Sequence, residues 1–168
     1  EDWNLKNPND PEGIAHLAHL LLLLKKDDLA FKKLNQALSI APDSALVQRN
    51  LARIYLKKNK PNDALTAATK AFTVDSHNHE NRLVLASALA ASGQNSKSME
   101  LVESIIKTNN DYAEAYAIRA LLRLQNKDLK NALVDCEKAL SIKPHLVQLW
   151  ALSAKLYYQE KSLLKAIT

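Results

Sequence analysis

Small side chains recur at a fixed interval of 34 positions along the chain. One series consists of alanine throughout, at Ala18, Ala52, Ala86, Ala120 and Ala154. A second series is small throughout, at Ala30, Ala64, Ser98, Ala132 and Ala166. A constant period of this length predicts a repeat protein, in which each repeat is one supersecondary unit. Small residues at these positions let neighbouring helix backbones approach closely.

Each repeat contains two predicted helices. The first helices cover Pro11–Leu24, Leu46–Lys58, Glu80–Ala91, Glu114–Gln125 and Gln148–Gln159. The second helices cover Asp28–Ile40, Asn62–Val74, Ser96–Lys107, Lys130–Ile142 and a short piece from Leu164. Short polar linkers join the two helices, and Pro42 and Pro144 follow second helices, which proline cannot continue. Each repeat is therefore predicted to be a helical hairpin.

These repeating positions resemble the tetratricopeptide repeat family over nearly the whole chain. The resemblance is carried by Leu17, Ala18, Ala30, Ala37, Pro42 and Tyr55, with their partners at 34-residue steps. It implies an all-α fold, a right-handed α-solenoid of antiparallel helix hairpins. Four repeats would be complete (11–44, 45–78, 79–112 and 113–146), with a partial fifth at 147–168. Residues 1–10 would be an N-terminal arm or the end of a preceding repeat, followed by a repeat domain over 11–168.

Two repeats depart from the family pattern. The third has Ser98, Ile105 and Asn110 where alanine, alanine and proline are typical. The fourth has Arg119 and Arg123 in place of the commoner leucine and tyrosine.

Composition agrees with packed helices, since the chain has only 2 glycines and 5 prolines. The net charge is +5, but lysine and arginine are spread over all repeats and no aromatic residues alternate with them. Nucleic acid is therefore not an expected partner. The longest apolar stretch, 14–24, is too short to cross a bilayer, so no membrane insertion is expected.

Catalytic motifs are missing, so the chain is predicted not to be an enzyme and to need no cofactor. It has no phosphate-binding glycine loop, no His-Glu-x-x-His motif and no nucleophile elbow. Cys136, the single cysteine, shares a repeat position with apolar residues and is predicted to lie in the core. Two histidine pairs lack a carboxylate at ligand spacing, so no metal site is expected: His16 with His19, and His77 with His79.

The family resemblance also implies that the first helix of each repeat lines a concave groove. In the second repeat, this places Arg49, Asn50, Arg53 and Lys57 on the groove. Arg49 and Arg53 are one helical turn apart, a spacing at which they can hold one carboxylate between them. The alternative is that both are solvated surface charges.

In the later repeats the implied groove positions are apolar: Leu83, Val84, Ala117, Ile118, Leu121 and Leu152. Contiguous exposed apolar surface usually marks a partner site. The alternative is that neighbouring repeats, the N-terminal segment with Trp3, or a second copy of the chain covers this apolar floor.

Two known binding modes of the family are disfavoured. The carboxylate clamp of chaperone-binding members would need Lys and Asn at Ala15 and His19, and Lys and Arg at Glu80 and Val84. Only Asn50 agrees with that clamp. Of the positions that form the asparagine ladder in the O-linked N-acetylglucosamine transferase superhelix, only Asn50 carries asparagine in this chain.

The sequence therefore predicts a non-enzymatic scaffold that binds a peptide or helix of another protein in its groove. One alternative is a regulatory or substrate-presenting arm of a larger enzyme, such as a transferase. Another is self-assembly into a homo-oligomer, in which Leu163, Leu164 and Ile167 of the unfinished repeat pack on another copy. A cytoplasmic location is favoured only slightly, because both ends look cut from a longer array and missing signals then carry little information. The groove specifies a surface chemistry and leaves open which protein binds it.

Overall fold

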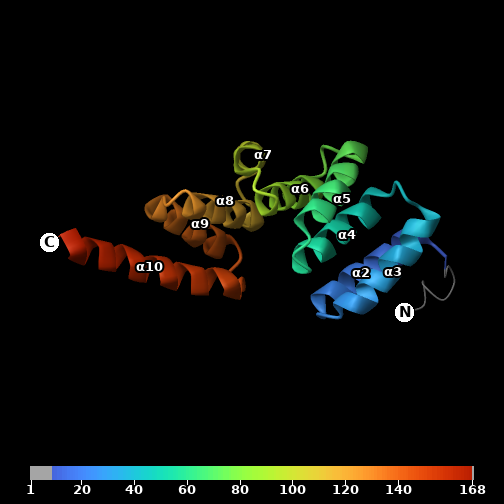
Figure 1. Ribbon diagram of the computed structural model, residues 1–168, viewed down its shortest axis with the longest axis horizontal. Coiled ribbons are helices and arrows are strands. Elements are labelled where there is room, and N and C mark those ends of the chain that lie inside the picture. The colour runs from blue at the N-terminus through green and yellow to red at the C-terminus, as the bar shows by residue number, and fades with distance from the viewer. Residues whose placement is uncertain (1–8, 168) are drawn as a thin grey trace. The chain divides into compact units, whose positions relative to one another are not determined.

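Helices account for all the regular secondary structure in the part of the chain that the structure describes. The computed structural model describes residues 9–167, apart from the side chains of residues 147, 148 and 160–167. Its helices are α2 (Pro11–Leu23), α3 (Asp27–Ile40), α4 (Ala45–Lys57), α5 (Pro61–Val74), α6 (His79–Ala91), α7 (Asn95–Thr108), α8 (Ala113–Gln125), α9 (Leu129–Ile142) and α10 (Val147–Ile167). The fold is an all-α helical repeat, and antiparallel pairs such as α2 with α3 and α8 with α9 are visible in Figure 1.

The chain divides into two compact units. The N-terminal unit extends to Gly93 and contains α2 to α6, and the C-terminal unit begins at Gln94 and contains α7 to α10. In the N-terminal unit, α4 packs against α2, α3, α5 and α6. In the C-terminal unit, α8 packs against α7 and α9, and α9 packs against α10.

The helix boundaries repeat with the predicted period. The helices that open a repeat begin at Pro11, Ala45, His79, Ala113 and Val147, each 34 residues after the one before. The helices that close a repeat begin at Asp27, Pro61, Asn95 and Leu129, with the same spacing. The predicted boundaries of the first eight helices are confirmed to within one residue.

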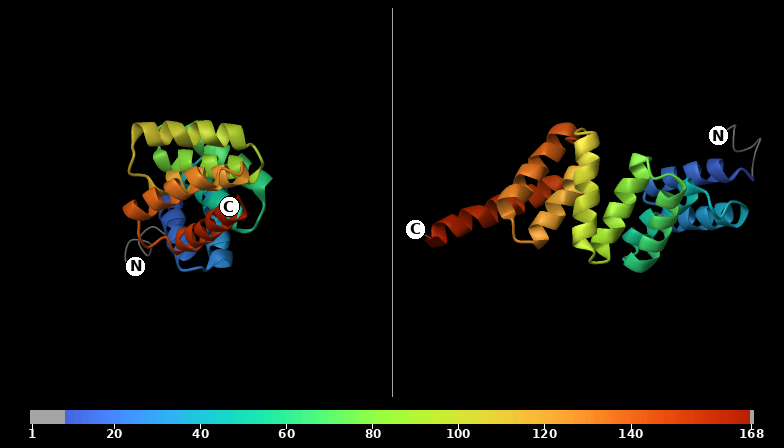
Figure 2. Two further views of the ribbon diagram at one scale, coloured as in Figure 1. Left: turned by 90° about the vertical axis from the view of Figure 1, so that its left-hand side faces the viewer. Right: turned by 90° about the horizontal axis from the view of Figure 1, so that it is seen from above.

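The predicted break after Gln159 is wrong. The last helix, α10, continues without interruption from Val147 to Ile167 (Figure 2). The positions that turn the chain in the earlier repeats, Lys25, Asn59, Gly93 and Lys127, have a positive φ, whereas α10 runs through the corresponding position 161.

Each hairpin turn contains one residue in the left-handed region. The φ angle is 58° at Lys25, 54° at Asn59, 80° at Gly93 and 63° at Lys127. After Lys25, Asn59 and Lys127, the next backbone N–H donates to the carbonyl five residues earlier, at 2.8, 2.8 and 2.9 Å. This is the Schellman arrangement, which satisfies carbonyls at the helix end while the chain turns back.

The small residues of the repeat form the contacts between helices. Their side chains are 0% exposed at Ala18, Ala52, Ala86, Ala120, Ala30, Ala64, Ser98 and Ala132. Ala154 holds the same repeat position as Ala18 but is exposed. A second helix covers this position in the earlier repeats, whereas α10 continues past it.

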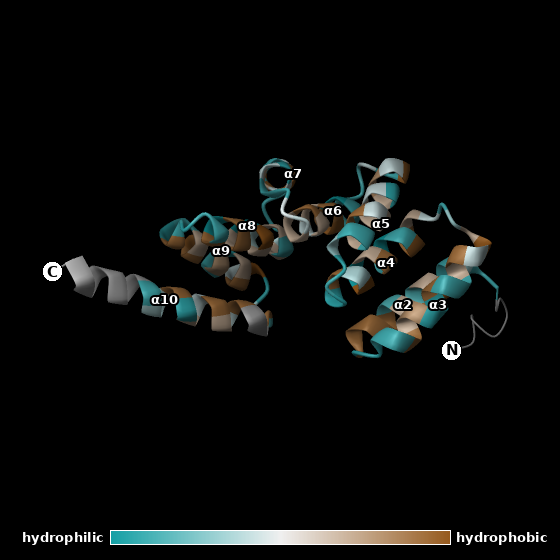
Figure 3. Cartoon of the chain, viewed as in Figure 1, coloured by the Kyte–Doolittle hydropathy of each residue, from teal (hydrophilic) through white to brown (hydrophobic). Residues whose placement is uncertain are grey.

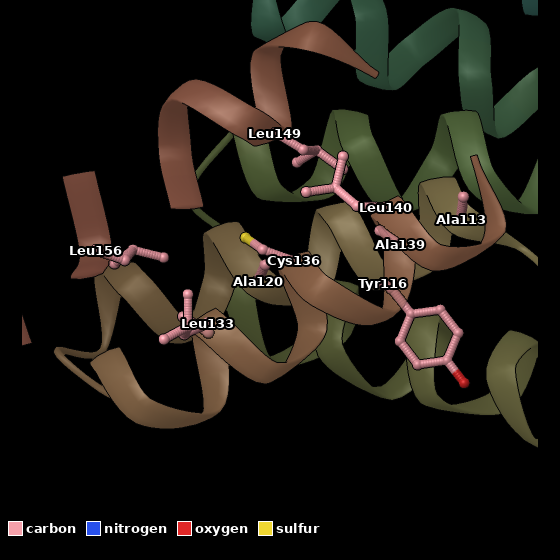
Figure 4. Packing of buried hydrophobic residues seen from close by; sticks show 10 residues of the cluster. Ala113, Tyr116, Ala120, Leu133, Cys136, Ala139, Leu140, Leu149 and Leu156 are labelled. Atoms are coloured by element: carbon pink, nitrogen blue, oxygen red, sulfur yellow. The ribbon is translucent and has the colours of Figure 1, made fainter. Parts of the chain in front are cut away.

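The core of the C-terminal unit lies between α8, α9 and α10 (Figure 4). Its labelled members are Ala113, Tyr116 and Ala120 of α8, Leu133, Cys136, Ala139 and Leu140 of α9, and Leu149 and Leu156 of α10. Cys136 is 0% exposed, so its predicted place in the core is confirmed. Burial raises the pKa of its thiol.

Two predictions fall on parts that are not described. The N-terminal arm with Trp3 lies outside the described residues, except for residues 9 and 10. The side chains of Leu163, Leu164 and Ile167, assigned to self-assembly, also lie outside them.

Candidate binding surface

A cluster of polar side chains lies on three neighbouring helices of the N-terminal unit. The arginine cluster, as we call it, consists of His19 on α2, Arg49, Asn50 and Arg53 on α4, and Glu80 on α6. All three helices open a repeat, and α4 packs against both α2 and α6. The cluster thus forms where one face of α4 meets its two neighbours.

Arg53 is the centre of this cluster. Its guanidinium forms an ion pair with the Glu80 carboxylate. Its Nη1 also donates to Asn50 Oδ1 at 3.1 Å and lies 3.5 Å from His19 Nδ1. The side chain of Arg53 is 24% exposed and that of Glu80 is 52% exposed. Arg53 therefore already holds a carboxylate, and that carboxylate belongs to this chain.

Arg49 binds amide groups instead of a carboxylate. Its Nη1 donates to Asn81 Oδ1 at 2.9 Å and to Asn78 Oδ1 at 3.3 Å. Its Nε is buried and has no hydrogen-bond partner among the described residues. Burial and the nearby charge of Arg53 lower the pKa of Arg49, whereas Glu80 and Asp75 oppose that shift.

The fold of α6 positions the amides that contact Arg49. Asn78 caps α6, because its side-chain oxygen accepts hydrogen bonds from the backbone N–H groups of Glu80 and Asn81. Asn81 is 0% exposed, and its amide nitrogen donates to the carbonyls of Ala71 and Asp75, at 3.0 Å each. The contact of Arg49 therefore reaches a rigid helix start.

The setting of His19 favours its neutral form. Burial and the nearby guanidinium of Arg53 lower its pKa from the ordinary value of 6.5, although Glu80 opposes the shift. The positive charges of the cluster are therefore the two guanidinium groups.

Two other predicted groove residues have structural contacts. Asn50 is 0% exposed, and its amide donates to the Ala15 carbonyl at 3.0 Å. Lys57 donates to Asp27 Oδ1 at 2.8 Å and to the Leu22 carbonyl at 3.2 Å. Lys57 thereby connects α4 to the turn between α2 and α3.

The predicted apolar floor is only partly available as surface. Leu83 and Val84 are each 6% exposed, so the expectation that they offer open apolar surface is wrong. Both lie on α6, which packs against α4 and α5 within the N-terminal unit.

The apolar positions of the C-terminal unit are more accessible. On α8, Ala117 and Ile118 are half-buried and Leu121 is 48% exposed. On α10, Leu152 is half-buried and packs against the core of that unit together with Ala117. Leu121 is therefore the most exposed of the predicted apolar groove residues.

A charged network in the C-terminal unit escaped the sequence reasoning. Asp135 on α9 is 1% exposed and accepts hydrogen bonds from Arg119 Nε at 2.9 Å, Arg119 Nη2 at 2.8 Å and Arg123 Nη1 at 2.7 Å. The bonds to Asp135 raise the pKa of Arg119. The available signal was that Arg119 and Arg123 occupy positions where other repeats carry apolar residues, which calls for a buried counter-charge.

Other chemistry is limited within the described part of the chain. No group of three histidine, cysteine, aspartate or glutamate side chains there could hold a metal ion. Among the same residues, no helix combines the length and apolar character needed to cross a membrane. The hydropathy of these helices varies along each one, with polar residues concentrated at the turns and at exposed faces (Figure 3).

Among curated proteins, the chain is similar to segments of much longer ones. It is 30% identical over 110 residues to RNA polymerase II-associated protein 3 of Xenopus laevis, covering 63% of this chain and 16% of that protein. It is 24% identical over 132 residues to human protein O-mannosyl-transferase TMTC1, covering 79% of this chain and 15% of that protein. The chain thus spans about a sixth of the length of these two relatives.

Solved structures show the same fold. The protein TTC0263 of Thermus thermophilus matches with a TM-score of 0.75 and 22% identity, over 92% of this chain and 85% of that one. The first repeat domain of Spaghetti (RPAP3), bound to the HSP90 peptide SRMEEVD, matches with a TM-score of 0.62 and 23% identity, over 70% of this chain and 96% of that one.

Two family models, both described as tetratricopeptide repeat, match residues 57–122 and 113–146. Together they cover more than half of the 168 residues. Their combined range includes parts of both units, in agreement with the 34-residue spacing of the helices. The chain therefore belongs to the tetratricopeptide repeat family.

Proposed function

We propose that this chain is a non-enzymatic interaction module, which binds an acidic peptide or helical segment of another protein on the helices that open its repeats. The arginine cluster is the observation that carries the proposal. It holds two guanidinium groups and one carboxylate, all partly open to solvent, so one positive charge is left for a ligand. An acidic side chain or a C-terminal carboxylate fits that charge.

The relatives support a peptide ligand in general terms. The RPAP3 domain that resembles this fold was solved with an acidic HSP90 peptide. The clamp expected for such a chaperone tail agrees with this chain only at Asn50, which is buried and bound to Ala15. We therefore assign the acidic ligand to Arg49 and Arg53 of the N-terminal unit.

Selection from a phage-displayed library of random peptides tests this function. Wild type is expected to enrich acidic sequences. Binding of the enriched peptides should be lost with Arg49→Gln/Arg53→Gln. Lys70→Gln, which removes an exposed charge from α5 in the same unit, should leave binding unchanged. No enrichment, or equal binding by the double arginine variant, would refute the proposal.

A second candidate is an arm of a larger enzyme. The observation that favours it is the match to the mannosyl-transferase TMTC1, of which this chain spans 15%. Sequencing the full-length transcript decides this point, because an adjoining transferase-like domain would support the arm. A reading frame without such a domain would remove this candidate.

A further inference from the structure

We infer that Glu80 is an internal competitor for the acidic ligand, so that a partner must displace its carboxylate from Arg53 before it can bind there. The inference rests on the proposed function and names the residue that sets its selectivity. A ligand with a single carboxylate that replaces Glu80 gains an ion pair with Arg53, but the existing pair between Glu80 and Arg53 is lost. The ligand class is therefore a segment with two adjacent acidic residues.

The exposure of the pair makes displacement feasible. Glu80 lies in the first turn of α6, and its side chain is 52% exposed, whereas Arg53 is 24% exposed. An ion pair between partly exposed groups is held weakly, because water competes for both charges. The Glu80 side chain can leave for solvent, while Arg53 stays fixed by its bond to the buried Asn50.

The charge balance explains why a second carboxylate adds affinity. Arg49 is one turn from Arg53 on the same helix, and its own contacts are the neutral amide oxygens of Asn78 and Asn81. Asp75 acts on Arg49 only through its field, and its Oδ1 accepts from the backbone N–H of Asn78. Once Glu80 has been displaced, two guanidinium charges face a ligand in place of one.

This arrangement distinguishes the surface from one that is open to any anion. With Glu80 in place, a ligand with one carboxylate can pair only with Arg49, and it gains nothing by displacing Glu80 from Arg53. A ligand with two carboxylates recovers the lost pair on Arg53 and adds attraction to Arg49. Glu80 thus acts as a specificity-determining residue without contacting the bound ligand.

Fluorescence anisotropy with labelled SRMEEVD tests the inference, because this peptide carries two adjacent glutamates. Glu80→Gln keeps the shape of the side chain and removes its charge. We expect it to bind SRMEEVD about tenfold more tightly than wild type. Glu100→Gln, which removes an exposed charge from α7 in the other unit, should match wild type. The carboxylate-free peptide SRMQQVN amide should bind both variants equally poorly.

The gain must depend on the freed guanidinium. Arg53→Gln in the Glu80→Gln background is expected to return the affinity to the wild-type level, with circular dichroism confirming an unchanged helix content. The inference is overturned if Glu80→Gln does not bind SRMEEVD more tightly, or if Glu100→Gln gains as much.

The two proposals fail in different ways. If library-selected peptides depend on Arg49 and Arg53 but bind Glu80→Gln no better than wild type, the proposed function stands and the inference falls. If neither the library nor SRMEEVD yields binding to any variant, both proposals fall.

Discussion

Replacing Asp135 by asparagine removes the charge at the centre of the buried network in the C-terminal unit. The side chain of Asp135 is 2% exposed, and those of Arg119 and Arg123 are 16% and 24% exposed. Three hydrogen bonds of 2.7 to 2.9 Å join them, so both guanidinium groups depend on this one carboxylate. Asp135→Asn keeps the volume and leaves the two positive charges facing each other without compensation.

The expected loss of stability is about 3 kcal/mol. Removing one partner of a buried ion pair costs about 3–5 kcal/mol, and we take the lower end because water still reaches both arginines. A triple variant, Arg119→Leu/Arg123→Leu/Asp135→Leu, replaces the whole network by apolar side chains. Other repeats carry leucine at these positions. Leu17, Leu51 and Leu85 correspond to Arg119, Leu21 and Leu89 correspond to Arg123, and Leu101 corresponds to Asp135. We expect the triple variant to be within about 1 kcal/mol of wild type.

Amide hydrogen exchange measures this effect locally, which suits a repeat array because its repeats need not unfold together. A loss of about 3 kcal/mol speeds exchange in α8 and α9 by about two orders of magnitude. Asp111→Asn, at an exposed residue of the same unit, is the control and should change nothing. If Asp135→Asn costs less than about 1 kcal/mol, or if the triple variant is as unstable as the single one, the argument from buried charge is refuted.

Three further predictions concern stability. Leu122→Ala should lower the free energy of unfolding in urea by about 2–5 kcal/mol, because Leu122 is 1% exposed. Leu20 holds the same repeat position but is 55% exposed, so Leu20→Ala should lower it by less than about 1 kcal/mol. Lys127→Gly should raise the free energy of unfolding by about 0.5–1 kcal/mol, because glycine adopts the positive φ of this position without strain. Gly93→Ala should lower the free energy of unfolding by about 1 kcal/mol because of the positive φ alone, since the added Cβ would meet nothing within 4 Å. His19 has a lowered pKa in the folded state, so the unfolded state binds more protons as the pH falls through 6.5, and stability should fall with it. His19→Gln should flatten that decline in thermal unfolding between about pH 7.5 and 5.5, and an equal decline in the variant would contradict the assignment.

The helix pattern could be predicted because many repeat positions have the same surroundings in successive repeats. Alanine is needed at positions such as Ala52 and Ala86 because another helix packs directly on them, and they are 0% exposed. The prediction failed at α10, where the same pattern continues but the helix runs on to Ile167. Ala154 fits the pattern as well as Ala52 does, and it is exposed.

The binding surface was predicted less completely, because its key contacts join different helices. The neighbouring placement of Arg49 and Arg53 follows from their spacing on one helix. The pairing of Arg53 with Glu80 spans 27 residues and depends on how α6 lies against α4, which helix periodicity alone does not determine. For the same reason, the resemblance placed Val84 on an open groove, whereas the residue is 6% exposed in the structure.

The two arginine pairs of this chain look alike in sequence, since each has two arginines four residues apart on a helix that opens a repeat. Their repeat positions separate them. Arg119 lies at the position of Leu51, which is 2% exposed, so its pair points into the packing between helices. Arg53 lies at the position of Leu121, which is 48% exposed, so Arg53 itself lies at a more open position. The carboxylates differ in the same way, because the side chain of Asp135 is 2% exposed and that of Glu80 is 52% exposed. A buried carboxylate cannot be exchanged for that of a ligand without unfolding its surroundings, whereas an exposed one can. Exposure of the acidic partner therefore separates the pair that holds the fold together from the pair to which we assign a ligand.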